Sequence, residues 1–168
     1  MDAAVVYESA WGNTRQVAEA VAEGIRERLS VEVLDVGSAP PAHVLGVELL
    51  VVGGPTHALG MSRPSTRDDA EERGGRHLTT GIREWLAASE PLHAHAAAFD
   101  THVRHPNLPG HAGRKAVKVL RRLGADVVAA PESFWVEGAE GPLLPGELDR
   151  ARAWGAELAG LLPQHAPV

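Results

Sequence analysis

The amino-acid sequence predicts an α/β domain in which a parallel sheet is covered by helices on both faces. Apolar runs typical of buried strands alternate about five times with amphipathic helical patterns within 168 residues. This alternation is typical of parallel sheets, because a connection between parallel neighbours needs a crossover that is usually helical. The length is that of one domain, and we expect residues 1–168 to form a single domain.

The expected strands differ in how deeply they are buried. Three runs are almost continuously apolar, as strands buried on both faces should be. They are residues 3–7, 49–54 and 95–101. Residues 31–36 alternate and are rich in valine, which indicates a strand near an edge. A last strand is expected over 126–136, with a bend or bulge at Pro131, because proline cannot donate to the ladder.

The helices between these strands are predicted by apolar residues at intervals of three and four. The clearest patterns are those of residues 17–29, 112–123 and 148–162. A shorter helix is expected at 82–86. Trp85 and Trp154 fall on two of these helices, and we expect both to be core residues.

Composition and charge exclude several classes of protein. The sequence has no cysteine, which excludes a disulfide framework, a zinc ribbon, an iron–sulfur cluster and a cysteine nucleophile. The apolar runs are too short to span a membrane and no export signal is evident, so we expect a cytoplasmic protein with no membrane partner. A net charge of −6 with only two lysines argues against nucleic acid and suits a basic protein partner.

The loops that follow the strands are the expected location of the functional site. In open parallel sheets, ligands bind at the carboxyl ends of strands where the strand order reverses. The loop at residues 8–14 contains hydroxyls and a glycine directly before a helix, a combination that suits a phosphate. An ordinary helix cap formed by Asn13 or Thr14 is the alternative. Trp11 favours the ligand, because a tryptophan is costly to expose in a tight loop.

Three of these loops also carry the resemblance to a known family. Residues 9–14 (SAWGNT) resemble the phosphate loop of the flavodoxin family. Residues 54–57 (GPTH) resemble its second ligand loop, and 99–101 (FDT) end the strand where its third ligand loop begins. The resemblance covers nearly the whole chain. It implies the three-layer, doubly wound flavodoxin-like fold, with five parallel strands in the order 2-1-3-4-5.

The resemblance implies that the protein binds FMN and transfers electrons between a reductase and an acceptor protein. The residues that would hold the phosphate are Ser9, Ala10, Trp11, Gly12, Asn13 and Thr14. Those that would line the two sides of the flavin ring are Pro55, Thr56 and His57, and opposite them Thr101, His102 and Val103 with Gly110. The flavin performs the redox chemistry in such proteins, so no catalytic residue is expected.

Two other functions remain open. An FMN-dependent oxidoreductase of the same fold would reduce a small molecule such as a quinone with NAD(P)H, and a long loop would complete its substrate pocket. A degenerate flavodoxin-like scaffold without flavin would act through protein contacts. The absence of Phe, Tyr and Trp between Asp100 and Gly113 favours this scaffold, because flavodoxins usually stack an aromatic residue on the flavin there.

The segment 55–77 has little apolar content, and segments of this length in a compact domain are generally functional or disordered. It forms either a lid or docking loop at the ligand or a solvated insertion with a short charged helix, and residues 58–67 are the half better suited to a functional role. Most of the nine histidines are expected at the surface, with His102 and His105 near the ligand and no metal site.

Phe134 and Trp135 end the last expected strand and are followed by the loop 137–144. We interpret this segment as a core aromatic followed by an ordinary connection. A dimer or partner interface formed by this loop is the weaker alternative.

Overall fold

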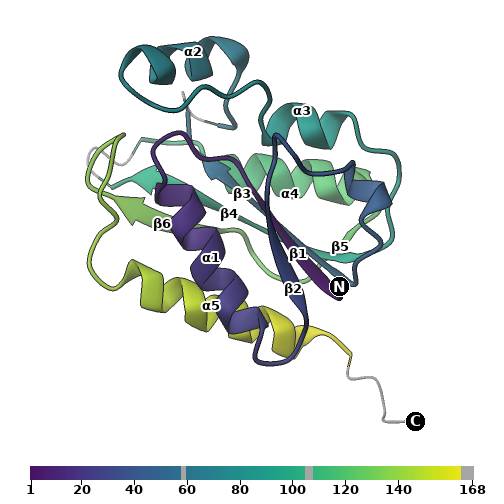
Figure 1. Cartoon of the computed structure of the whole chain (residues 1–168). Coiled ribbons are helices and arrows are strands. Elements are labelled where there is room, and N and C mark those ends of the chain that lie inside the picture. Colours follow the sequence, from purple (N-terminus) through teal and green to yellow (C-terminus); the bar gives the residue numbers. More distant parts are fainter. Residues whose placement is uncertain (58–59, 105–107, 164–168) are drawn as a thin grey trace.

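The computed structural model describes residues 1–57, 60–104 and 108–163. Its centre is a parallel sheet with the strand order β2-β1-β3-β4-β5, in which β6 also pairs with β4 (Figure 1). The strands are β1 (Ala3–Tyr7), β2 (Val31–Asp35), β3 (Leu49–Pro55), β4 (His95–Val103), β5 (Asp126–Val127) and β6 (Glu132–Val136). The fold class and strand order predicted from the sequence are confirmed.

Helices cover both faces of this sheet (Figure 1). They are α1 (Asn13–Ile25), α2 (Pro64–Glu72), α3 (Ile82–Ala87), α4 (Ala112–Arg122) and α5 (Glu147–Leu161), with a short 3-10 helix, η1 (Ala42–Val44). On one face α1 packs against α5, and α3 and α4 cover the other face. The remaining helix, α2, lies beyond the carboxyl ends of the strands. In the part of the chain that the structure describes, no helix could cross a membrane.

Two short strands share the last position of the sheet. β5 pairs with the beginning of β4 and β6 pairs with its end, from Glu132 onward. Between them Val128 still donates to the carbonyl of Ala96 at 3.0 Å, and the ladder then stops until after Pro131. The bend expected at Pro131 is therefore a complete break in the strand, consistent with the missing N–H of proline.

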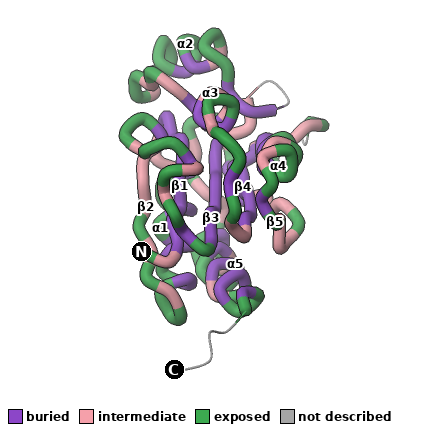
Figure 2. The backbone as a smooth tube through the Cα atoms, turned by 90° about the vertical axis from the view of Figure 1, so that its right-hand side faces the viewer, coloured by how far each residue is buried: buried purple, intermediate pink, exposed green. Residues whose placement is uncertain are grey.

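Each face of the sheet has its own apolar core. Under α1 and α5, the Phe99 ring lies edge-on to Phe134 and Trp154, with centroid distances of 6.0 and 6.1 Å. Trp85 belongs to the core under α3 and α4, and it is as deeply buried as Trp154, both being 7% exposed. Burial decreases from β1, β3 and β4 to β2 and β5 at the sheet edges (Figure 2). This is the gradient that the alternating pattern of residues 31–36 indicated.

Candidate functional site

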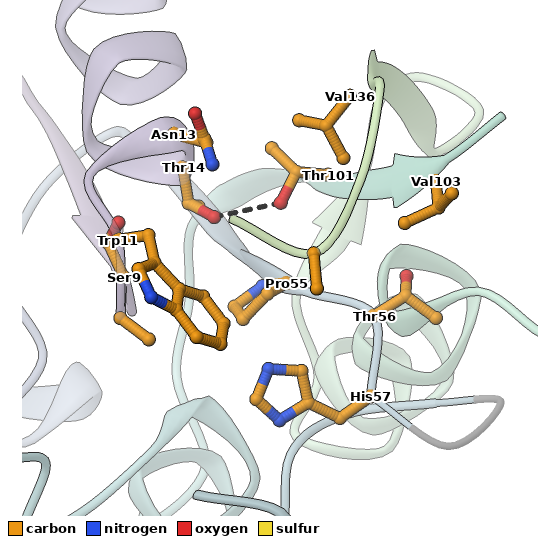
Figure 3. A pocket seen from close by; sticks show the side chains of 12 residues that line it. Ser9, Trp11, Asn13, Thr14, Pro55, Thr56, His57, Thr101, Val103 and Val136 are labelled. Atoms are coloured by element: carbon orange, nitrogen blue, oxygen red, sulfur yellow. Dashed lines mark hydrogen bonds between the residues drawn. The ribbon is translucent and has the colours of Figure 1, made fainter. Parts of the chain in front are cut away.

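A pocket lies at the carboxyl ends of β1, β3 and β4 (Figure 3). Its lining comes from the ends of β3, β4 and β6, from the first turn of α1 and from the loops after β1, β3 and β6. The lining residues are Ser9, Ala10, Trp11, Asn13, Thr14, Pro55, Thr56, His57, Thr101, Val103, Val136 and Ala139. The topology accounts for this position, because the chain leaves the neighbouring strands β1 and β3 toward opposite faces of the sheet and so opens a crevice between them.

The loop between β1 and α1 leaves the start of the helix open to an anion. Gly12 has a φ of 93°, a left-handed conformation that favours glycine, and its N–H donates to the Ser9 hydroxyl at 3.0 Å. Among the described residues no side chain caps α1, and its first turn carries no acidic residue. The positive end of the α1 dipole therefore lies beside Asn13 and Thr14, which line the pocket.

Hydrogen bonds tie the neighbouring loops together at the pocket. The Thr14 and Thr101 hydroxyl oxygens lie 2.9 Å apart, joining the first turn of α1 to β4 (Figure 3). The Thr56 N–H donates to the Thr101 carbonyl at 2.9 Å. The Thr56 hydroxyl in turn accepts from the N–H of Ala112, the first residue of α4, at 3.2 Å. Side chains from three segments of the chain are thereby held in fixed positions at the pocket.

Two ring side chains form one wall of the pocket. Trp11 and His57 lie on the same side of it, and Thr101, Val103 and Val136 lie opposite (Figure 3). The Nδ1 atom of His57 is 3.2 Å from the Thr66 hydroxyl in α2. Burial, together with the nearby Arg67 cation, lowers the pKa of His57 below its usual 6.5, so the imidazole is neutral at pH 7.

The segment 55–77 folds against the loop that follows β1. The Arg76 N–H donates to the Ala10 carbonyl at 2.8 Å, and its guanidinium binds Asp35 at 2.5 Å. Gly75 lies so close to Trp11 that an added Cβ would be 3.2 Å from the indole Cε2. Residues 58 and 59 lie outside the described residues. The described part of the segment contains the charged helix that one interpretation predicted, and it also packs on the pocket wall as the other requires.

Sequence reasoning missed a buried polar cluster beneath this segment. Glu8 is 1% exposed, and its carboxylate accepts from the Ser62 hydroxyl at 2.5 Å and from the Ile82 N–H at 2.8 Å. Arg67 donates to the same hydroxyl at 2.9 Å and forms an ion pair with Glu84 at 2.9 Å. Burial raises the pKa of Glu8 above its usual value. The signal in the sequence was an acidic residue directly after an interior strand.

Gly12, His102 and Gly110 do not line this pocket. Gly12 shapes the turn, and side chains alternate along a strand, so His102 points to the face of β4 opposite Thr101. The two His102 ring nitrogens lie 2.6 Å from the Val103 carbonyl and 3.1 Å from that of Gly110. The expectation that His102 and Gly110 contact the flavin stays a prediction, since neither residue lines the described pocket, and His105 lies outside the described residues.

The loop after β6 contributes to the pocket although its motif was interpreted as an ordinary connection. Val136 and Ala139 line the pocket, and an added Cβ on Gly141 would lie 2.5 Å from Oδ1 of Asn13. The rule that ligands bind at the carboxyl ends of parallel strands predicted a role for the residues after 136. The composition of this loop did not. Phe134 is fully buried, as expected of a core residue. Within residues 1–57, 60–104 and 108–163, no three metal-ligating side chains come together.

Comparison with known proteins supports one family. The flavodoxin family model matches residues 5–79. A flavodoxin from the domain Archaea is 24% identical, with a TM-score of 0.69 over 95% of this chain and 97% of that one. Flavodoxin 1 from Bacillus cereus is 21% identical, with a TM-score of 0.71 over 96% and 99% of the two chains. Flavodoxin 2 from Bacillus cereus is 15% identical, with a TM-score of 0.73 over 96% of this chain and 100% of that one.

No curated protein matches the chain. The structural likeness, at these identities, concerns the fold, whereas the family-model match concerns the sequence of residues 5–79, a range that includes the loops after β1 and β3. Together they show that this chain is similar to the flavodoxin family in sequence over residues 5–79 and to flavodoxins in fold over nearly its whole length.

Proposed function

We propose that this protein binds FMN noncovalently in the pocket and carries electrons between two other proteins. The observation that carries the proposal is the uncapped start of α1, which shares one pocket with two ring side chains from the loops after β1 and β3. When bound, FMN supplies one- and two-electron redox chemistry, and the protein supplies binding, orientation and electrostatics.

The donors at the start of α1 fit a phosphate group. The hydroxyls of Ser9 and Thr14 and the amide of Asn13 line this end of the pocket, and no lysine or arginine lies among the residues described there. The charge of the phosphate would therefore be balanced by helix N–H groups and neutral donors. The left-handed conformation of Gly12, which favours glycine, allows this close turn of the backbone.

The rest of the pocket fits a flat, largely apolar ring system. The indole of Trp11 and the imidazole of His57 provide one wall, and Val103 and Val136 contribute apolar surface to the other (Figure 3). Stacking and apolar burial are the interactions that position such rings. The role of these side chains would be to exclude water from the ring and to hold it in one orientation.

An absorption spectrum of the purified protein, taken after incubation with FMN and desalting, tests the proposal. We expect a retained flavin band at about one flavin per chain. A protein that stays colourless would overturn FMN binding and favour a scaffold without flavin. Rapid turnover of NAD(P)H with a quinone by the loaded protein would instead indicate the oxidoreductase.

A matched pair of variants tests the assignment of the phosphate end. Gly12→Asp and Gly12→Asn place side chains of equal size at the same left-handed position, where nothing lies within 4 Å of an added Cβ. Only the aspartate adds a negative charge beside the start of α1, where it would repel a bound phosphate. We expect the aspartate variant to bind FMN at least tenfold more weakly than the asparagine variant. Equal affinities, with unchanged circular dichroism, would exclude a phosphate at this turn.

A further inference from the structure

One helix next to the pocket is strongly basic in a chain whose net charge is −6. Helix α4 carries both lysines of the sequence together with three arginines, and it has no acidic residue. These five side chains are exposed, whereas its apolar residues face the sheet. We call the five side chains the α4 basic face: Arg114, Lys115, Lys118, Arg121 and Arg122.

The charges of the α4 basic face are not neutralised within the described part of the chain. None of its five residues takes part in an ion pair there. Five arginines elsewhere do form ion pairs, among them Arg15 with Glu19, Arg76 with Asp35 and Arg152 with Glu23. The positive potential over α4 is therefore directed outward, to solvent.

This surface begins at the rim of the pocket. The first residue of α4, Ala112, donates its N–H to the pocket residue Thr56. One turn further, Lys115 lies beside Gly60, and its Cγ would be 3.7 Å from a Cβ added there. Gly60 is in turn bonded to the pocket residue His57 by two backbone hydrogen bonds of 2.8 and 2.9 Å. A protein seated on α4 would therefore also cover one edge of the pocket.

We propose that the α4 basic face is the docking surface for an acidic redox protein. The inference rests on the proposed function, since an electron-transfer partner must approach the edge of the pocket. Complementary charge accelerates the encounter of two such proteins and sets their relative orientation. The net charge of the chain had suggested a basic partner. The α4 basic face points instead to an acidic partner, because net charge averages over faces of opposite sign.

Two features of the chain favour a protein over other polyanions. The apolar residues of α4, such as Val117 and Leu120, are buried, so this helix has no apolar side chains with which to insert into a membrane. The remainder of the chain is acidic, which repels a long polyanion such as duplex DNA beyond the length of one short helix. A compact acidic protein can bind to the α4 basic face without contacting the acidic remainder of the surface.

The test measures binding of a labelled plant-type [2Fe–2S] ferredoxin, a small acidic redox protein, by fluorescence anisotropy with and without FMN. We expect binding at low ionic strength that weakens at least tenfold at about 0.3 M salt, where the Debye length falls to roughly 6 Å. In Lys115→Glu/Lys118→Glu we expect at least tenfold weaker binding. The control, Arg26→Glu/Arg28→Glu, makes the same charge change at exposed residues after α1 and should lose less than threefold.

Each other outcome overturns the proposal. No ferredoxin binding at low salt, or equal losses in both double variants, would show that α4 has no special role. Tighter α4-dependent binding to duplex DNA or to phosphatidylserine vesicles would assign the surface to nucleic acid or to membrane. Loss of flavin is measured separately on the same samples, so a failure of FMN binding is distinguishable from a failure of docking.

Discussion

The hydroxyl oxygens of Thr14 and Thr101 lie 2.9 Å apart although 87 residues separate them in the sequence. Thr14 is in the first turn of α1, and Thr101 is near the end of β4. Both side chains are nearly inaccessible to water, with 2% and 5% exposure. The bond therefore fixes the start of α1 relative to the central sheet at the pocket.

Replacing either threonine should leave a buried hydroxyl without its partner. We expect Thr14→Val and Thr101→Val each to lower the free energy of unfolding by about 1–2 kcal/mol. In the double variant both hydroxyls are gone, so its loss should be smaller than the sum of the single losses by about 1 kcal/mol. Urea denaturation of the four proteins completes the cycle. Strict additivity would contradict a direct interaction.

The backbone at Gly81 passes so close to the buried side chains of Glu8, Ser62 and Arg67 that it leaves no room for a side chain. An added Cβ would be 2.5 Å from an Arg67 nitrogen and 2.9 Å from the Ser62 hydroxyl. We expect Gly81→Ala to destabilise the protein by about 2–4 kcal/mol, because it displaces buried groups that must then lose their hydrogen bonds. Thermal unfolding measures this loss. Gly138→Ala, with nothing within 4 Å of its Cβ, is the control and should change stability by less than about 1 kcal/mol.

The Glu8 carboxyl should make stability depend on pH in a specific direction. Burial raises its pKa above the usual 4.5, so between 4.5 and the raised value the folded protein binds a proton that the unfolded chain has released. The contribution of Glu8 to the free energy of unfolding is therefore present at low pH and is lost as pH rises through this window. Glu8→Gln removes the titration and should flatten the profile there. Parallel profiles for the two proteins, measured by urea denaturation, would contradict the assignment.

Two histidines of the segment 55–77 should titrate in opposite directions. Burial, with Arg67 adding to it, lowers the pKa of His57, and the hydrogen bond to Glu71 raises the pKa of the exposed His77. In an NMR titration of the ring protons, we expect the His57 midpoint below 6.5 and the His77 midpoint above it. Stability supplied by neutral His57 is then lost as pH falls below 6.5. A His57 midpoint at or above that of His77 would show that the ring is not buried in solution.

The order of strands and helices could be predicted because burial leaves a local pattern in sequence. Each of these patterns lies within about a dozen residues and predicts one element. Examples are the apolar runs 3–7 and 49–54, which predict strands, and the helical spacing of apolar residues that ends at Leu29. Trp85 and Trp154 were expected in the core for the same reason, and both are buried there. The position of the pocket also followed from topology alone, because strand ends meet where the order reverses.

The contacts that join distant segments could not be predicted in this way. Glu8 meets Ser62 and Ile82 across 54 and 74 residues, and no local pattern encodes such a meeting. The direction of the His102 side chain could not be predicted for a different reason. β4 continues two residues beyond the expected end at 101, so His102 remains in the strand and alternates away from Thr101.

The division of the last sheet position between β5 and β6 also bears on aggregation. A long, regular edge strand presents unpaired backbone groups to which a second chain can add a strand. Here that edge consists of segments of two and five residues, separated by a stretch that includes a proline. Leu143 in addition forms an antiparallel bridge with Val136 at the end of the longer segment. Even at high protein concentration, this side of the sheet offers little template for intermolecular strand pairing.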